Sequence, residues 1–179
     1  MCACRARSLT HDEHDDLFND HCERVHMANI AQTINVLQAT ILTEGARMLC
    51  TPTCHVFEMY KAHHDAVRLP VTLDAPDYEH AGQKIPALSA SASRDGQGRV
   101  HISLCNLHPS RDVALDCQLR GWQARAVQGR ILTGAAIDAH NTFDHPNRLA
   151  PAAFSGARLA PTGLGIELPA KSVAVLEVT

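Results

Sequence analysis

The spacing of apolar residues changes near residue 66, and this change limits what the chain can fold into. On the C-terminal side, apolar and polar residues alternate in short runs separated by turn residues. A period of two is typical of strands with one buried face, and a series of such strands is typical of an antiparallel sandwich. We predict strands at residues 67–73, 88–93, 100–105, 113–119, 124–132 and 171–178.

The connections between these strands differ in length. Residues 94–98, R-D-G-Q-G, are predicted to be a hairpin turn whose glycines tolerate a positive φ. Residues 74–84 contain a proline and a glycine among polar side chains, so we expect a loop. Residues 133–161 are predicted to be a long loop anchored by Phe143 and Phe154.

On the N-terminal side, residues 24–61 have the pattern of strands alternating with helices. Residues 24–30 hold a short apolar run and are predicted to be a strand. A helix is predicted next, because the following apolar residues are four, three and four apart and share one helical face: Ile30, Ile34, Leu37 and Ile41. Gly45 is expected to end this helix.

A second strand and a second helix follow. Residues 48–50 are apolar, and the T-P-T that comes after them is expected to end the strand, because proline lacks an amide donor. Residues 56–60 indicate a helix that ends near His63 or His64. The order strand, helix, strand, helix is typical of parallel βα units. We therefore predict an α+β composite: the end of an α/β domain over residues 1–65, and a sandwich over residues 66–179.

The composition argues against several classes of function. Aromatic residues are only 4% of the chain, fewer than a dense sugar-binding surface requires. The net charge is −3 with scattered Lys and Arg, whereas nucleic-acid binding needs a basic face. No apolar run reaches membrane-spanning length, and the first residues lack the apolar core of a signal peptide. We expect a cytoplasmic protein that binds neither nucleic acid nor a membrane.

The cysteines are expected to be free thiols, because their number is odd and the compartment is reducing. There are seven of them: Cys2, Cys4, Cys22, Cys50, Cys54, Cys105 and Cys117. Cys2 and Cys4 with His11 and His14 fit no common zinc spacing, so we predict an irregular terminus and no metal or other cofactor.

Three further candidates have a structural interpretation. The spacing of Cys50 and Cys54 is not the C-x-x-C of thiol enzymes, and Cys50 lies in an apolar run, which favours a buried structural cysteine. Glu44 and Glu58 are expected at the surface. Trp122 follows a turn of the sandwich, so packing or exposure at the rim is favoured over a sugar-stacking platform.

Six segments of the chain occur in the order found in one enzyme family. With them the chain, from about residue 15 onward, resembles the α-L-arabinofuranosidases of glycoside hydrolase family 51. The segments are R-V-H-M-A-N-I-A-Q-T-I-N-V-L-Q at 24–38, L-C-T-P-T-C-H-V-F-E-M-Y-K at 49–61, S-A-S-R-D at 91–95, R-V-H-I-S-L-C-N-L at 99–107, H-N-T-F-D at 140–144 and L-P-A-K-S-V-A-V-L-E at 168–177.

The resemblance implies an architecture. Family members are much longer and have a (β/α)8 catalytic barrel followed by a C-terminal β-sandwich. Residues 1–65 would then be the last two βα units of a TIM barrel. The strand edge and helix faces that the other units cover would be exposed, and an N-terminal segment that adds a strand to the sandwich would be missing. We therefore expect poor solubility or homo-oligomers.

The resemblance also implies a function. Family members release terminal arabinofuranosyl residues from arabinoxylan and arabinan oligosaccharides with retention, which needs two carboxyl groups roughly 5 Å apart. Both catalytic glutamates lie in family motifs that this chain lacks, so we expect no catalytic residue here and no activity of the chain alone. Gln32 matches the glutamine that hydrogen-bonds the arabinofuranosyl unit. Cys54 departs from the aromatic residue, usually tyrosine, that is common in the family.

A second hypothesis belongs to another class of function. The chain would be a non-catalytic β-sandwich module that serves assembly or weak glycan contact.

Overall fold

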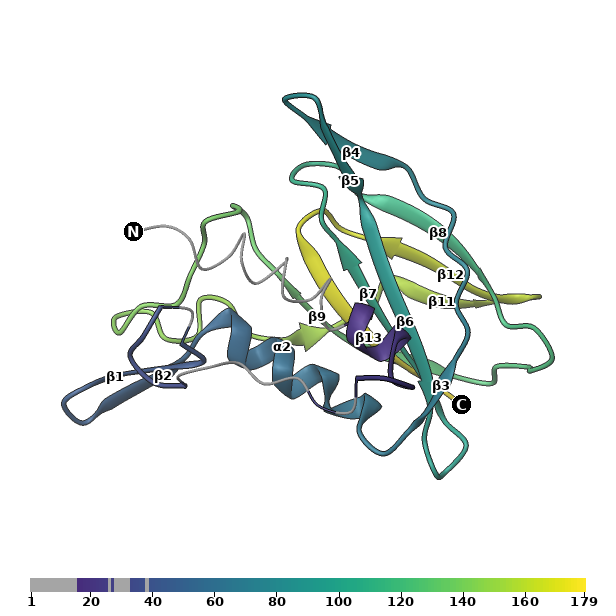
Figure 1. The fold of residues 1–179 in the computed structure, drawn as a ribbon, viewed down its shortest axis with the longest axis horizontal. Coiled ribbons are helices and arrows are strands. Elements are labelled where there is room, and N and C mark those ends of the chain that lie inside the picture. The colour runs from purple at the N-terminus through teal and green to yellow at the C-terminus, as the bar shows by residue number, and fades with distance from the viewer. Residues whose placement is uncertain (1–15, 26, 28–32, 38) are drawn as a thin grey trace.

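The computed structural model describes residues 16–25, 27, 33–37 and 39–179, and Figure 1 shows their arrangement. Residues 16–20 are helical, and most of the other elements are strands. The named elements are β1 Ile41–Glu44, β2 Arg47–Cys50, α2 Pro52–Tyr60, the 3-10 helix η1 Lys61–His63, β3 Val67–Leu69, β4 Asp77–His80, β5 Gln83–Pro86, β6 Leu88–Arg94, β7 Val100–Asn106, β8 Val113–Gln118, β9 Val127–Thr133, β10 Ala152–Ala153, β11 Ala157–Ala160, β12 Gly163–Leu168 and β13 Ser172–Val178.

Two of the sheets pack face to face as a sandwich. The larger sheet has six strands in the order β10-β9-β13-β7-β6-β3, and the smaller has three in the order β11-β12-β8. All pairs between these strands are antiparallel. Buried side chains from both sheets meet between them, including Ile102, Leu164, Leu168 and Leu176. Burying each such side chain contributes about 2 kcal/mol. The predicted antiparallel sandwich is confirmed.

The helix α2 covers the other face of the six-stranded sheet, beside β9 and β13 (Figure 1). Its buried Val56 and Met59 share a hydrophobic cluster with Val173 and Val175 of β13. The central strand β13 is therefore buried on both faces, since Leu176 points into the sandwich core. The predicted domain boundary near residue 66 stays a prediction.

The predicted second helix is confirmed, and the structure shows why it begins at Pro52. Thr51 is the N-cap, and its hydroxyl accepts a hydrogen bond from the Cys54 amide at 3.5 Å. Pro52 suits the first helical position because no amide is needed there and its φ is preset. The 3-10 turn η1 then ends at His63, as expected.

The helix predicted through Ile41 is wrong in its C-terminal half. Residues 41–50 form the antiparallel hairpin β1–β2, and Gly45 has a φ of 59° in its turn rather than beyond a helix end. Asn35 also has a positive φ, of 55°, which a helix does not allow. Its side chain bonds the Thr43 amide at 2.7 Å and the Thr43 hydroxyl at 2.8 Å. The second predicted strand, at residues 48–50, is therefore one arm of an antiparallel hairpin. Its predicted parallel arrangement with the strand at residues 24–30 stays a prediction, because most of that strand lies outside the described residues.

Two of the predicted loops contain strands. Residues 77–86 form the hairpin β4–β5, and β10 and β11 lie within residues 133–161. The β4–β5 strands are mostly exposed, so no alternating apolar pattern marks them. The predictions also missed β12, although Leu164, Ile166 and Leu168 alternate and are buried there. The hairpin turn at residues 94–98 is confirmed, with Gly98 at a φ of 82°.

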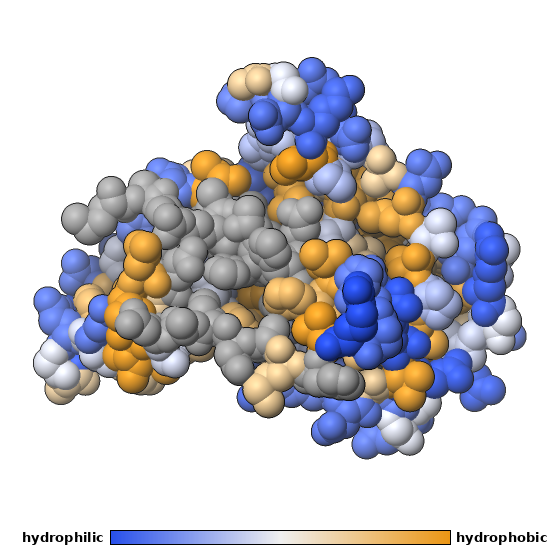
Figure 2. All heavy atoms as spheres, in the orientation of Figure 1, coloured by the Kyte–Doolittle hydropathy of each residue, from blue (hydrophilic) through white to orange (hydrophobic). Residues whose placement is uncertain are grey.

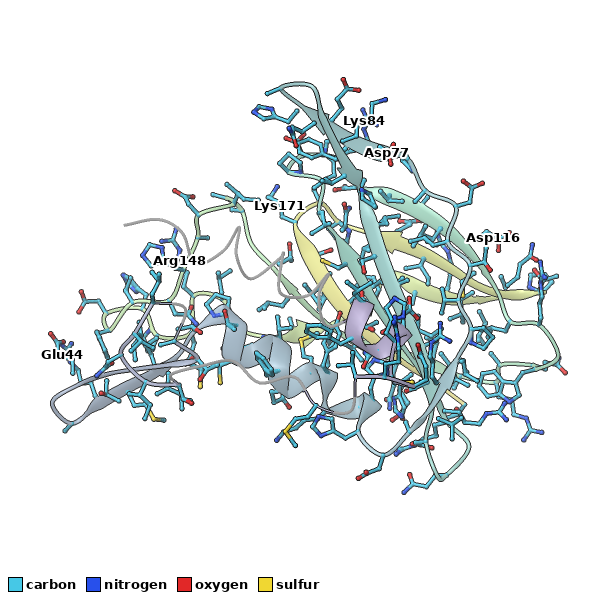
Figure 3. All side chains as sticks on the ribbon, viewed as in Figure 1. Glu44, Asp77, Lys84, Asp116, Arg148 and Lys171 are labelled. Carbon is cyan, nitrogen blue, oxygen red and sulfur yellow. The ribbon has the colours of Figure 1, made fainter. Side chains whose placement is uncertain are left out.

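The surface combines exposed apolar groups with dispersed charges. Figure 2 shows apolar side chains at the β1–β2 end of the molecule, where Leu37 is 73% and Met48 64% exposed. In Figure 3 the labelled charges lie on separate elements, from Glu44 at the β1–β2 turn to Lys84 on the β4–β5 hairpin. Within the described residues, no helix has the length and apolar character that crossing a membrane requires.

Candidate functional site

The sequence-predicted site residue, Gln32, and most of the predicted strand at residues 24–30 lie outside the described residues. Thr33, the residue that follows Gln32, is hydrogen-bonded to the residues at the start of β1. The carbonyl of Thr33 accepts hydrogen bonds from the Ile41 amide and from the Thr40 hydroxyl, both at 3.1 Å. The structure therefore places the C-terminal neighbour of Gln32 against the start of β1.

Among the described residues, polar side chains gather on the face of the six-stranded sheet that α2 covers. The strand register aligns them in rows. Ser91 of β6 lies beside Ser103 of β7, and the next row is Ser93, His101 and Glu177. Sequence analysis missed this face, although the alternating serines of S-A-S-A-S at 89–93 mark a polar stripe on one side of a strand.

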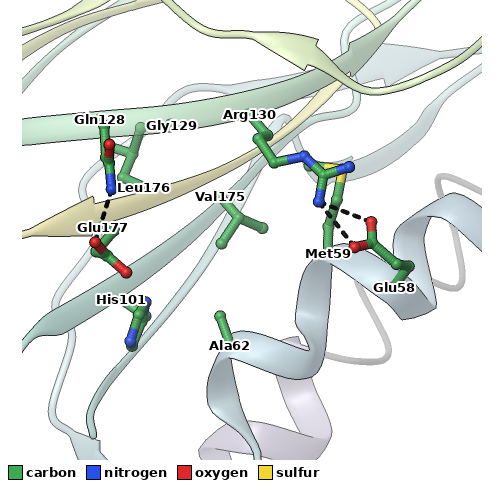
Figure 4. Close-up of a pocket in the computed structure, with 10 residues that line it drawn as sticks. All are labelled: Glu58, Met59, Ala62, His101, Gln128, Gly129, Arg130, Val175, Leu176 and Glu177. Atoms are coloured by element: carbon green, nitrogen blue, oxygen red, sulfur yellow. Dashed lines mark hydrogen bonds and ion pairs between the residues drawn. The ribbon is translucent and has the colours of Figure 1, made fainter. Parts of the chain in front are cut away.

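A pocket of about 420 Å³ opens where α2 leaves the sheet (Figure 4). Its floor is apolar, with Met59, Ala62 and Val175. Two polar pairs flank it. Arg130 donates to Glu58 at 2.9 and 2.8 Å, and Gln128 donates to Glu177 at 2.7 Å (Figure 4).

Each carboxylate of the pocket already has a cationic partner. Glu58 pairs with Arg130, and Glu177 also pairs with Arg99 at 3.0 Å. A glycosidase needs one carboxyl group that donates a proton and a second that attacks the sugar. Because both carboxylates are held in ion pairs with arginines, this pocket does not present two free carboxyl groups. The pocket can hold a small polar molecule by hydrogen bonds.

A second polar cluster surrounds Asp16, whose side chain is only 2% exposed. One oxygen accepts hydrogen bonds from Tyr60 at 3.2 Å, Ser91 at 2.7 Å and Ser103 at 2.8 Å. The other accepts from Ser89 at 2.7 Å. Burial raises the pKa of Asp16, and the four hydroxyl donors only partly oppose this shift. The cluster joins residues 16–20 to the sheet, which is a structural role.

Histidines continue this polar face. Nδ1 of His63 lies 2.7 Å from the Ser93 hydroxyl, and its Nε2 is buried with no hydrogen-bond partner in the described part of the chain. Burial, and then repulsion from His101 and His64, lowers the pKa of His63 to about 4.

His101 belongs to a neighbouring ionic group. Its Nε2 lies 3.1 Å from Asp95. Burial opposes the charge of Asp95, but hydrogen bonds from His101, from Arg99 and from the Gln97 amide outweigh it and hold the pKa of that carboxyl well below its usual range.

The low pKa of His63 predicts a loss of stability in mild acid. Below about pH 6.5 the unfolded chain takes up a proton at this histidine, and the folded chain does so only near pH 4. Between pH 7 and pH 5 the group should therefore lower the free energy of unfolding by about 2 kcal/mol. In His63→Gln this part of the pH dependence should vanish, as measured by urea unfolding at both pH values.

His80, which is exposed on the β4–β5 hairpin, supplies the matched control. His80→Gln should keep the pH dependence of the original chain. The assignment fails if His63→Gln loses as much stability between the two pH values as the original chain does.

The structure also places the other sequence-predicted candidates. Glu44 and Glu58 are largely exposed and pair with Arg47 and Arg130, as a surface role requires. Trp122 is partly buried and packs against the sandwich core, so the packing role is confirmed.

The predicted burial of Cys50 is only partly correct, because Cys50 and Cys54 are each half-buried. In the described part of the chain, no group of three or more His, Cys, Asp and Glu side chains could hold a metal ion. Cys2, Cys4, His11 and His14 lie outside that part.

Comparisons with known proteins identify the family. The model of the α-L-arabinofuranosidase C-terminal domain matches residues 16–172. An intracellular exo-α-L-arabinofuranosidase of Bacteroides ovatus is 38% identical over 164 residues, which are 91% of this chain and 32% of that protein. An intracellular exo-α-(1→5)-L-arabinofuranosidase of Streptomyces lividans is 29% identical over 142 residues, 78% of this chain and 21% of that protein.

A solved structure agrees with the family assignment. The crystal structure of a family 51 arabinofuranosidase from Xanthomonas axonopodis pv. citri has a TM-score of 0.94 and 43% identity, and the match covers 98% of this chain and 36% of that one. The chain thus spans about a third of the length of the first relatives it matches. On these matches and on the fold, the chain belongs to the C-terminal domain family of the α-L-arabinofuranosidases of glycoside hydrolase family 51.

Proposed function

We propose that this chain is the C-terminal part of an enzyme that releases terminal arabinofuranosyl residues from arabinoxylan or arabinan oligosaccharides. The family match over residues 16–172 is the observation that carries the proposal. The structural match to a family 51 arabinofuranosidase over 98% of the chain supports it. In this proposal residues 1–65 complete a catalytic (β/α)8 barrel. Its last helix is α2, and the β1–β2 hairpin is the connection that precedes this helix.

The 179-residue chain alone is proposed to be inactive. The reaction needs a carboxylic acid and a carboxylate nucleophile on opposite sides of the scissile bond. In the pocket of the described residues, Glu58 and Glu177 each pair with an arginine. The catalytic carboxyl groups would come from a part of the enzyme that has no counterpart in this chain.

Gln32 is proposed to bind the arabinofuranosyl unit. An amide side chain offers a donor and an acceptor, which suits neighbouring sugar hydroxyls. The hydrogen bonds of the next residue, Thr33, to β1 support the role, because they tie this segment to the hairpin and, through the Thr51 cap, to α2.

The remaining parts of the proposal concern location and partners. The names of both curated relatives include the word intracellular, which supports a cytoplasmic location. Arabinose-containing oligosaccharides are the proposed ligands. A homo-oligomer is proposed because Ile34, Leu37 and Met48 expose apolar surface near the β1–β2 hairpin (Figure 2).

A chimera tests the function. The chain alone should not release 4-nitrophenol from 4-nitrophenyl α-L-arabinofuranoside. Joined to the first two thirds of the Bacteroides ovatus relative, in place of that protein's own C-terminal third, it should hydrolyse this substrate. Gln32→Ala in the chimera should then lower kcat/KM by roughly 10- to 100-fold, because the substrate loses hydrogen bonds in a desolvated site.

Gln83→Ala, at an exposed position of β5, is the control and should leave kcat/KM unchanged. Circular dichroism and gel filtration establish that each chimera is folded. A folded but inactive chimera would contradict the proposed function, and an active chimera that tolerates Gln32→Ala would contradict only the role of Gln32. Turnover by the purified chain itself, absent from a mock preparation, would overturn its proposed inactivity.

A further inference from the structure

We propose that Cys50 and Cys54 are a redox-active thiol pair, which a low-molecular-mass disulfide such as oxidised glutathione converts into an intramolecular disulfide between the end of β2 and the first turn of α2. The proposal does not depend on the proposed function. It rests on the position of the two thiols, on their accessibility and on the frame that holds them.

The two thiols are neighbours because of the local fold. Cys50 is the last residue of β2, and Cys54 lies in the first turn of α2. Side chains of a helix tilt toward its N-terminus, so the Cys54 thiol is directed back toward β2. There it interacts directly with the Cys50 thiol. Both residues are half-buried, so a small reagent can reach them.

The backbone between the two cysteines is held in place from several sides. The Thr51 hydroxyl donates to the Ala39 carbonyl at 2.8 Å and accepts from the Cys54 amide at 3.5 Å. The Asn141 side chain donates to the Cys50 carbonyl at 2.9 Å. Pro52 restricts φ at the first helical position. These contacts keep the pair together before any oxidation, so closing the disulfide costs little chain entropy.

The chemistry is a thiol–disulfide exchange in two steps. One thiolate attacks the glutathione disulfide, which forms a mixed disulfide and releases one glutathione thiolate. The second thiolate then attacks the protein sulfur of this mixed disulfide and releases the second glutathione. In the sum, two protein thiols lose two protons and two electrons, and one glutathione disulfide takes them up to become two glutathione thiols.

The surroundings of the two thiols determine how fast this exchange proceeds. Burial, then the contact with Cys50 and the nearby Glu58, raises the pKa of Cys54 to about 11. The Cys54 thiol is therefore mostly protonated near pH 7, and closure should accelerate as the pH rises toward that value. Of the other described cysteines, Cys105 is buried in the core, Cys22 is exposed, and Cys117 is half-buried on β8.

Mass spectrometry of the oxidised chain tests the proposal. After incubation with oxidised glutathione at mildly alkaline pH, the chain is unfolded, alkylated and cleaved with trypsin. Residues 48–61 form one tryptic peptide that holds both cysteines. We expect this peptide without alkylation and lighter by two hydrogens, while Cys105 is alkylated. Cys54→Ser should instead leave glutathione attached to Cys50.

The contribution of the fold is measured in glutathione redox buffers, with and without urea. The equilibrium constant for closing the pair should be at least about tenfold larger in the folded chain than in the unfolded one. Thiols that stay fully alkylated after oxidation, or a stable mixed disulfide in the original chain, would overturn the proposal. Equal constants in the two states would overturn it as well.

Discussion

Replacing Gly163 with alanine should destabilise the sandwich by more than about 3 kcal/mol, because the new methyl group has no room. Gly163 begins β12 with a φ of 155°, a conformation that other residues rarely adopt. A Cβ there would lie 2.0 Å from the Cys117 carbonyl oxygen and 3.0 Å from the Leu119 amide nitrogen. Both are backbone atoms, one within β8 and one just after it, so relieving the clash requires the paired strands themselves to move. Urea unfolding followed by circular dichroism measures the loss.

Gly165, two residues further along β12, is the matched control. Its added Cβ would meet only the flexible Arg158 side chain, at 3.7 Å. Gly165→Ala should therefore change the free energy of unfolding by less than about 1 kcal/mol. The prediction is also supported if the Gly163→Ala chain is insoluble while the Gly165→Ala chain is soluble. Equal stability of the two variants contradicts it.

The contrast between these glycines indicates what sequence analysis could predict. Strands such as β7 and β13 were predictable, because their side chains alternate and their pairing buries both partners. The strand β12 was missed because glycines at the first and third positions of G-L-G-I-E-L weaken the alternating signal. Its position depends on the close approach of Gly163 to β8, which only the assembled sheet reveals.

In the N-terminal part of the chain, the sequence prediction was wrong for a different reason. The spacing of Ile34, Leu37 and Ile41 fits a helical face, but Ile34 and Leu37 are exposed in the described structure. Two local features determine the hairpin instead: the hydrogen bonds between Asn35 and Thr43, and the positive φ that Gly45 adopts in the turn. Asparagine favours such local hydrogen bonds over a position inside a helix. The polar residues of this segment therefore indicated a turn, although the spacing of its apolar residues indicated a helix.

The candidate site was only partly predictable for a related reason. Gln32 followed from a resemblance, because no spacing within the chain identifies a sugar-binding amide. The polar face under α2 joins Asp16 to serines that are 73, 75 and 87 residues away. Alternating serines predict a polar stripe, but no local pattern predicts which distant acid it binds.

Asp16→Ala should be the second most damaging change, at about 3 kcal/mol. The buried hydroxyls of Ser91, Ser103 and Tyr60 would lose the acceptor that they share. Asp16→Asn keeps one acceptor oxygen and removes the buried charge, so it should cost about 1 kcal/mol. Asp20→Ala breaks a partly exposed pair with Arg68 and should cost less than about 1 kcal/mol. Urea unfolding at neutral pH compares the three variants.

The pH dependence separates the charge of Asp16 from its hydrogen bonds. The folded-state pKa is raised above 3.8, so the contribution of Asp16 is complete below pH 3.8 and declines as the pH rises through the folded value. Asp16→Asn lacks this decline, and its stability relative to the original chain should therefore improve with rising pH. If the difference in free energy of unfolding between Asp16→Asn and the original chain did not change with pH, burying the charge of Asp16 would cost no stability. Equal losses for Asp16→Ala and Asp20→Ala would mean that the serine face does not anchor residues 16–20.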